Sequence, residues 1–223
     1  MAANLENIGK LRYFAGVDRS LVTGLAQLFS EKSFIKGQNI VSEGERDETL
    51  HFVNTGVVKI FKTSAEGKEQ IIKLARPGDS FNDLAVFSDG PSPYSAQALG
   101  TITMVYKINK SDLVPVMKSN WKITMNAIEI LAEQSRLLLT LIEDLSFKNV
   151  TNRVAKILLQ HLAPGPEGIP RLTQYEMAAM AGTAREVVGR SLKSLEDSGA
   201  IKLERHRIVI SNKEYLEQLA GNN

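Results

Sequence analysis

The sequence contains no cysteine. Disulfide bonds, thiolate metal sites and cysteine-ligated iron–sulfur clusters are therefore excluded. No apolar run approaches the roughly 20 residues that a membrane-spanning helix needs, and the first residues lack the basic-then-apolar pattern of a secretory signal. We therefore expect a soluble, cytoplasmic protein with no membrane partner.

The signatures of several enzyme classes are missing as well. We find no glycine-rich phosphate loop, no His-Glu-x-x-His metal motif and no nucleophile elbow. Asp83 and Asp89 are close in the sequence, but carboxylates in such a turn-rich stretch usually form turns. We expect neither catalytic activity nor a metal site.

The net charge of +2 is unevenly distributed along the 223 residues. Residues 1–147 carry 16 Lys and Arg against 17 Asp and Glu, whereas residues 148–223 carry 11 against 8. A length of 223 residues is sufficient for two domains. The mildly basic C-terminal third indicates a nucleic-acid partner.

Glycine punctuates the stretch from about 33 to 108, at positions 37, 44, 56, 67, 78, 90 and 100. Short runs rich in Val, Ile and Phe lie between these glycines. Short strands at regular spacing, each followed by a turn signal, predict an antiparallel sandwich or barrel. Before this region, residues 5–30 have helical spacing, with Asp18 as a candidate N-cap.

Residues 119–147 contain neither Gly nor Pro and predict one helix, about 38 Å long if it has roughly 25 residues. A helix of this length predicts a partner helix, so we expect a dimer; the alternative is a helix packed on its own barrel. Within the expected seam, polar Gln134 is a candidate register device. The apolar positions of this seam alternate steps of four and three, at Ala127, Leu131, Gln134, Leu138, Leu141 and Leu145.

A helix-turn-helix is predicted near the C-terminus. Thr173-Gln174-Tyr175-Glu176 has the spacing of a capping box, and the helix that it opens ends at Gly182. Thr183-Ala184-Arg185-Glu186 repeats the spacing and opens a second helix, and residues 200–210 predict a small hairpin, the wing. A further helix is expected over 154–162, followed by a loop rich in Pro and Gly at 163–170.

The second helix has side chains of the kind that can read DNA bases. Arg can bond bidentately to guanine, Glu can accept from cytosine, and recognition helices use their N-terminal residues for base contacts. The alternative is that these charges are solvated, with Glu186 serving only as a capping partner. The residues that we predict to contact DNA are Arg185, Glu186, Arg190, Thr173, Gln174, Thr183 and Lys193.

Four segments, 147–154, 173–176, 185–190 and 195–201, resemble the hinge and helix-turn-helix signature of the Crp/Fnr transcription regulators. The resemblance implies an α+β fold: a β-roll of the cyclic-nucleotide-binding type with flanking helices at 1–118, a dimerisation helix and hinge at 119–147, and a winged helix-turn-helix at 148–223. It further implies a homodimer that binds an inverted repeat of TGTGA-like half-sites in double-stranded DNA and contacts RNA polymerase, with activation and repression of transcription both left open.

The sensor departs from the pattern of the cyclic-AMP-binding members. Where they carry Gly-Glu-Leu and Arg-Ser-Ala, this sequence reads Asn82-Asp83-Leu84 and Tyr94-Ser95-Ala96. Tyr94 has neither the charge nor the bidentate fork of an Arg. We therefore predict an effector other than cyclic AMP. The predicted effector-binding residues are Asn82, Asp83, Leu84, Tyr94, Ser95, Leu138 and Leu139, and the hinge is expected around 144–149.

Several effectors stay open. The expected apolar pocket between the roll and the long helix is similar to that of the heme-dependent branches, which respond to nitric oxide or carbon monoxide. The candidate axial ligands of a heme are His51, His161, and Met104 or another of the six methionines. A small organic acid, an aromatic effector or no effector are the other choices, so the cofactor is unknown. His206 in the wing is a candidate phosphate contact. A module that regulates another protein through direct contacts is the alternative to DNA binding.

Overall fold

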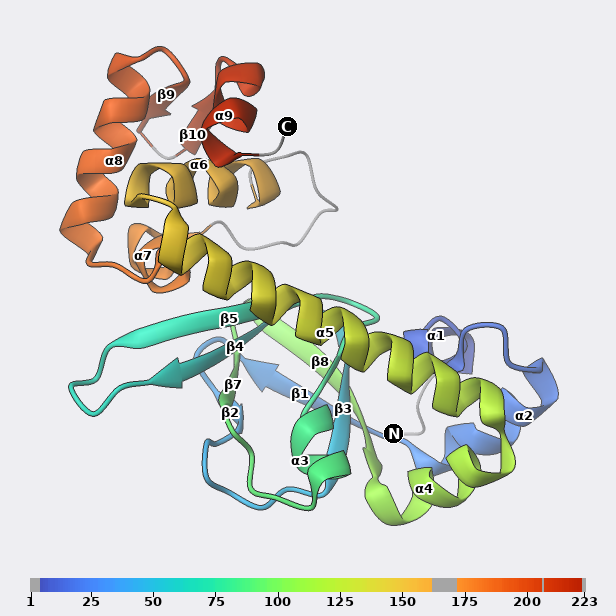
Figure 1. Ribbon diagram of the computed structural model, residues 1–223. Coiled ribbons are helices and arrows are strands. Elements are labelled where there is room, and N and C mark those ends of the chain that lie inside the picture. Colours follow the sequence, from blue (N-terminus) through green and yellow to red (C-terminus); the bar gives the residue numbers. More distant parts are fainter. Residues whose placement is uncertain (1–4, 162–171, 206, 222–223) are drawn as a thin grey trace. The chain divides into compact units, whose positions relative to one another are not determined.

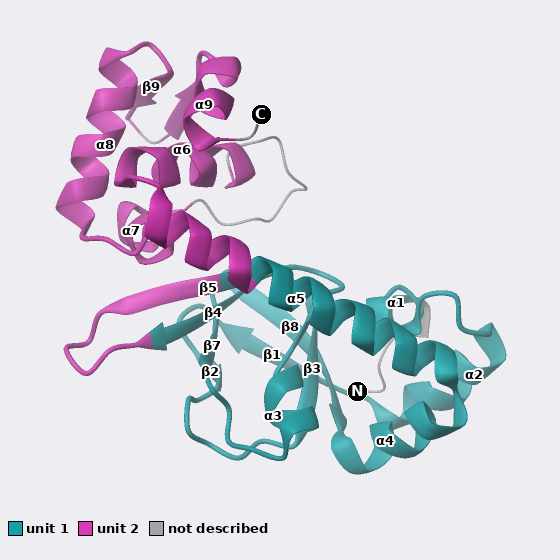
Figure 2. Ribbon diagram, in the orientation of Figure 1, with its two compact units in different colours: residues 1–62, 73–137 teal, residues 63–72, 138–223 magenta. Residues whose placement is uncertain are grey.

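The computed structural model describes residues 5–161, 172–205 and 207–221. Within these ranges the chain forms two compact units (Figure 2), one from residues 1–62 and 73–137, the other from 63–72 and 138–223. A short hairpin segment of the first half of the chain therefore belongs to the same unit as the C-terminal third. The domain boundaries expected from the sequence stay predictions.

Two antiparallel sheets lie mainly in the first unit (Figure 1), as the glycine spacing predicts, and one of their strands, β5, begins in the second unit. Their strand orders are β1-β8-β3-β6 and β2-β7-β4-β5. The strands are β1 Ser30–Ile35, β2 Asn39–Val41, β3 Thr49–Thr55, β4 Val58–Thr63, β5 Glu69–Ala75, β6 Ser80–Phe81, β7 Ser95–Ala98 and β8 Ile102–Asn109.

Gly56, in the turn between β3 and β4, shows why small residues punctuate this region. Its φ is 84°, and an added Cβ would lie 2.7 Å from Oγ1 of Thr103 and 2.8 Å from the carbonyl oxygen of Ile102. Only glycine fits a left-handed turn at this distance from a neighbouring backbone. The turn therefore keeps β3 and β4 close to the start of β8.

Helices cover the sheets of this unit and complete its core. Asp18 is the N-cap of α2 and accepts a hydrogen bond from Ser20 N, which confirms the prediction. Helices and strands share a core of aromatic and aliphatic side chains, among them Phe52 and Tyr106. The helical segments are α1 Leu5–Ile8, η1 Arg12–Phe14, α2 Arg19–Leu25, η2 Ala26–Leu28, α3 Asp83–Ser88, α4 Lys110–Ser119 and α5 Trp121–Phe147.

The second unit contains the end of α5 and a helical domain with a two-stranded wing. The predicted helix at 154–162 starts four residues earlier, because Asn149 Oδ1 accepts from Asn152 N and begins the helix there. The predicted loop at 163–170 lies outside the described residues. The elements are α6 Val150–His161, α7 Gln174–Ala181, α8 Arg185–Asp197, β9 Ile201–Glu204, β10 Arg207–Ile210 and α9 Lys213–Ala220.

The core of this domain is continuous from α6 to α9. Its buried side chains include Val154 and Leu158 of α6 and Leu192 and Leu195 of α8. Strands β9 and β10 pair antiparallel with Ile208 opposite Leu203, so the predicted wing is present. Among the described helices, none has the length and apolar composition to cross a membrane.

Candidate DNA-binding and sensor sites

Helix α7 begins with the capping box that the sequence predicts. Thr173 Oγ1 accepts from Glu176 N at 3.2 Å, and Glu176 Oε2 accepts from Thr173 N at 2.6 Å. Two N–H groups at the start of the helix thus have partners. Thr173 and Gln174 are both exposed beside this start, as a contact with DNA backbone would require.

The second predicted capping box is wrong. Helix α8 begins at Arg185, its N-cap is Ala184, and no side chain caps it. Thr183 instead belongs to the end of α7, because its N–H donates to Ala178 O at 3.1 Å. The turn after Gly182 therefore places Thr183 one residue too early for the capping position.

Helix α8 has one buried and one exposed face. Val188, Leu192 and Leu195 are buried at 0–1% exposure. The predicted base-contacting residues Arg185, Glu186 and Arg190 are exposed. An amphipathic helix held in this way presents its polar face outward.

Lys193 differs from the other predicted DNA-contacting residues because it already has partners. Its Nζ lies 3.0 Å from Glu196 Oε2 and 3.2 Å from Asp197 Oδ1, which raises its pKa. Glu196 also accepts from Leu203 N at 2.9 Å, so it links the end of α8 to the wing. The two carboxylates offset the positive charge of Lys193, which weakens its attraction for phosphate.

Asp83 is the centre of a buried hydrogen-bond network in the predicted sensor. It is fully buried and accepts from the hydroxyl of Tyr13, from Ser80 Oγ at 2.9 Å and from Gln134 Nε2 at 3.3 Å. These donors come from the N-terminal segment, β6 and α5. The carboxylate that the sequence assigns to an effector is thus bonded by the chain's own side chains.

Asn82 and Tyr94 meet beside Asp83. Asn82 has a φ of 70°, and its backbone N–H donates to the Tyr94 hydroxyl at 2.8 Å. Burial, and next the charge of Asp83, raises the pKa of both Tyr94 and Tyr13, so both hydroxyls stay neutral. The sequence prediction missed Tyr13, which lies 70 positions from Asp83.

The other predicted effector-binding residues lie in more open positions. Leu84 is 40% exposed, and Ser95 Oγ accepts from Glu43 N at 3.1 Å. Leu138 and Leu139 belong to the second unit, where they are 39% and 66% exposed. The structure therefore brings together Asn82, Asp83 and Tyr94 of the predicted set.

His51 is unsuited to hold a heme. It is 1% exposed, its Nε2 lies 2.9 Å from Asp47 Oδ2, and its ring stacks on Phe81 at 5.0 Å. An axial ligand needs a free nitrogen with open space beside it, and although Nδ1 of His51 has no hydrogen-bond partner, it is buried. No group of three or more metal-ligating side chains is found in the described part of the chain.

The predicted seam on α5 needs a correction at two positions. Ala127 is 1% exposed within the first unit's own core, and Gln134 is bonded to Asp83. These positions therefore face the roll, as in the alternative of an intrachain core helix. Leu131 and Leu141 are half-buried, and Leu145 is 39% exposed.

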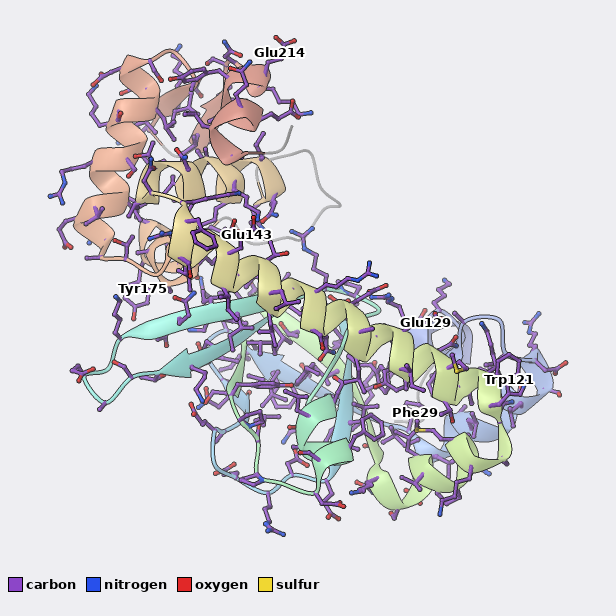
Figure 3. All side chains as sticks on the ribbon, viewed as in Figure 1. Phe29, Trp121, Glu129, Glu143, Tyr175 and Glu214 are labelled. Carbon is purple, nitrogen blue, oxygen red and sulfur yellow. The ribbon has the colours of Figure 1, made fainter. Side chains whose placement is uncertain are left out.

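A different apolar stripe of α5 is exposed. Trp121, at the N-terminal end of the helix (Figure 3), is 74% exposed, and Met125 and Ile128 follow it at steps of four and three. The same register continues through Ala132 and Ser135 to Leu139 and Ile142. The exposed members of this second stripe are Trp121, Met125, Ile128, Leu139 and Ile142.

An ionic cluster occupies the predicted hinge around 144–149. Asp144 Oδ1 lies 3.0 Å from Lys148 Nζ, and its Oδ2 lies 2.5 Å from Lys156 Nζ. Arg153 adds a bond from Nη1 to Lys148 O at 2.6 Å. These contacts tie the last turns of α5 to α6, so this stretch is not a freely rotating joint.

Two known protein families match this chain, one over the strand-rich domain and one over the helix-turn-helix. Residues 31–120 match the model of the cyclic nucleotide-binding domain, and residues 152–219 match that of the Crp-like helix-turn-helix domain. Both matched segments agree with the sensor and the DNA-binding elements described above.

The chain is similar over nearly its whole length to known transcription regulators. The chain is 29% identical over 222 residues to a CRP-like cAMP-activated global transcriptional regulator of Mycobacterium tuberculosis, covering 96% of this chain and 99% of the relative. It is 28% identical over 192 residues to the cyclic AMP receptor protein of Thermus thermophilus, covering 86% and 88%. FixK2 from Bradyrhizobium japonicum superposes with a TM-score of 0.75 at 25% identity, covering 86% and 96%. The chain therefore belongs to the Crp/Fnr family of transcription regulators, with a cyclic nucleotide-binding domain followed by a Crp-like helix-turn-helix.

Proposed function

We propose that this chain acts as a homodimer that binds an inverted repeat of TGTGA-like half-sites through α8. The observation that carries the proposal is the exposed face formed by Arg185, Glu186 and Arg190 at the start of a helix whose other face is buried. Arg can bond two acceptors of guanine, and Glu can accept from cytosine, so this face has the chemistry to discriminate base pairs. RNA polymerase is the expected partner at promoters.

The dimer would use the exposed stripe of α5 that begins at Trp121. Its 3-4 spacing is that of a coiled-coil seam, and exposed apolar side chains gain from a partner helix. Ile128→Glu would place a charge in this seam and is expected to give a monomer by light scattering. Glu129→Gln, at the next position, is the control and should leave the mass unchanged.

The effector is proposed to differ from cyclic AMP, although one relative is named a cAMP-activated regulator and another a cyclic AMP receptor protein. Tyr94 is 8% exposed and bonded to Asn82, and Asp83 is bonded by three internal donors. A cyclic phosphate would meet a buried phenol in place of a cation. Calorimetry with cyclic AMP should show no micromolar binding; such binding would overturn this part of the proposal.

DNA binding is tested by fluorescence anisotropy of the effector-free protein. A TGTGA-type inverted repeat is compared with a scrambled duplex at one salt concentration, because phosphate contacts alone give salt-dependent, sequence-blind binding. Preference for the repeat supports the proposal and identifies a free dimer that is already competent. Equal binding of both duplexes, with and without nitric oxide or carbon monoxide on heme-loaded protein, would favour a module that acts through protein contacts.

A further inference from the structure

The turn between α7 and α8 is held by residues from outside the helix-turn-helix. A helix leaves its last carbonyls without partners inside the helix. Ala178 O accepts from Thr183 N at 3.1 Å. The last two carbonyls of α7 instead accept hydrogen bonds from side chains outside the helix-turn-helix. Met180 O accepts from Gln70 Nε2 at 3.3 Å, and Ala181 O accepts from Arg153 Nε at 2.7 Å.

Gln70 lies in β5, 110 positions before Met180. It is half-buried, and its amide also donates to Ile71 O at 3.0 Å. Residues 63–72, which carry Gln70, form one compact unit with the C-terminal third of the chain. A segment that leads directly into the sensor sheet is thus in contact with the DNA-binding elements.

Gly182 shows how close this contact is. Its φ is 63°, and a Cβ on it would lie 2.6 Å from Leu145 Cδ2 and 2.9 Å from Gln70 Oε1. The end of α5 and the side chain of Gln70 therefore both lie against the turn, whose left-handed backbone favours glycine.

The start of α8 depends on this turn because it has no cap of its own. Ala184 supplies no side-chain bond, and Arg185 follows Gly182 by three positions. A shift of the turn would move Arg185 relative to a base pair, and bidentate base contacts tolerate little displacement. Phosphate contacts along the rest of the surface would be less sensitive.

We infer that Gln70 is a positioning residue for the recognition helix α8, through which the hairpin segment of residues 63–72 sets the placement of Arg185. The inference rests on the proposed function. It predicts that the hairpin influences base discrimination directly, in addition to any effect through α5.

The first test replaces Gln70 by Met, which keeps the length of the side chain and removes both donors. Gln97→Met is the matched control, since Gln97 is also a half-buried strand residue and donates one bond, to Asn39 Oδ1 at 3.0 Å. In the anisotropy assay, Gln70→Met is expected to raise the Kd for the inverted repeat about fivefold, which corresponds to one hydrogen bond. The Kd for the scrambled duplex and the midpoint of thermal unfolding should stay as in the wild type.

Two results would overturn the inference. One is an unchanged ratio of the two Kd values in Gln70→Met; the other is an equal loss on both duplexes, which indicates a general structural role. A second readout separates this inference from the proposed function. Amide hydrogen exchange of the free protein should be faster over residues 183–188 in Gln70→Met than in Gln97→Met, whichever DNA sequence the protein binds. Equal exchange in the two variants would also contradict the positioning role.

Discussion

Gln134 of α5 donates a hydrogen bond to Oδ2 of the buried Asp83, so the long helix and the predicted sensor are directly connected. The other two donors to this carboxylate are the hydroxyls of Tyr13 and Ser80. Because Asp83 is fully buried, an effector that contacts the carboxylate has to move side chains that enclose it, and Gln134 is one of them. Displacement of Gln134 would change the contact of α5 with the roll, which would give the proposed effector a physical route to the proposed dimer helix.

Gln134→Leu removes one donor from this network. Because Asp83 is fully buried, the lost bond to a charged acceptor is expected to lower the free energy of unfolding by about 1.5–3 kcal/mol. Urea denaturation measures this change. Gln97→Leu, which breaks a more exposed bond to Asn39, should cost clearly less. An equal cost for the two variants would contradict the importance of the network.

Thr173→Ala and Thr183→Ala distinguish the capping box that is present from the one that is absent. Thr173 caps α7 with its side chain, so its replacement should cost about 1 kcal/mol of stability. Thr183 caps no helix in this way, and its replacement should change the free energy of unfolding by less than about 0.5 kcal/mol. The reverse order of the two costs would restore the box at Thr183.

Arg185→Ala tests base discrimination by the recognition helix. Loss of a bidentate contact should cost about 1–3 kcal/mol on the inverted repeat and relax the preference for one base pair. Lys193→Ala is the comparison, because Lys193 is already paired with Glu196 and Asp197. We expect a smaller loss for it, alike on repeat and scrambled duplexes in the anisotropy assay. Retained discrimination by Arg185→Ala would exclude Arg185 as a base reader.

The lowered pKa of His51 predicts how the free energy of unfolding depends on pH. Burial lowers the pKa of His51 despite the nearby carboxylates of Asp47 and Asp83, with Lys107 acting in the same direction as burial. The unfolded state, with a pKa near 6.5, then binds the proton more tightly than the folded state. Stability is therefore greatest above this value and falls as the pH drops below it, by at most about 1.4 kcal/mol per pH unit for one proton.

Asp47 acts in a separate pH window. Burial raises its pKa, but hydrogen bonds from His51 and Thr49 outweigh burial and lower it below 3.8. Its contribution is therefore fully present above 3.8 and is lost as the pH falls from there through the lowered value. Urea titrations between pH 7 and 5 should show the decline for the wild type and for His161→Gln, and a smaller one for His51→Gln. A His51→Gln variant with the full decline would assign it to other groups.

Asp144→Asn tests the ionic cluster at the end of α5. The variant leaves Lys148 and Lys156 without their carboxylate, at side-chain exposures of 19% and 14%. We expect a loss of about 3 kcal/mol, at the lower end for buried ion pairs because some exposure remains. Glu217→Gln, which breaks the exposed pair with Lys213, should cost clearly less, because solvent screens this pair. Equal costs in denaturation would show that the hinge is not clamped by these charges.

Local signals in the sequence were sufficient to predict the helix-turn-helix. The capping box at Thr173, the left-handed Gly182 and the 3.6-residue spacing of Val188, Leu192 and Leu195 each depend on residues a few positions apart. Such short-range rules determine where a helix starts, ends and is apolar. The capping box expected at Thr183 was wrong because the same spacing can lie one residue away from the true start of a helix.

The sequence by itself determined that the chain has a strand-rich sensor, a long helix and a winged helix-turn-helix, since periodicity and turn residues are local properties. Only the tertiary structure decided which apolar stripe of α5 faces the roll. Ala127 and Ile128 are neighbours in stripes of the same 3-4 spacing, but one is 1% and the other 51% exposed. Periodicity defines a stripe, whereas burial depends on what packs against it. The contacts of Asp83 with Tyr13 and of Gln70 with Met180 join residues 70 and 110 positions apart, and no local pattern determines such distant pairs.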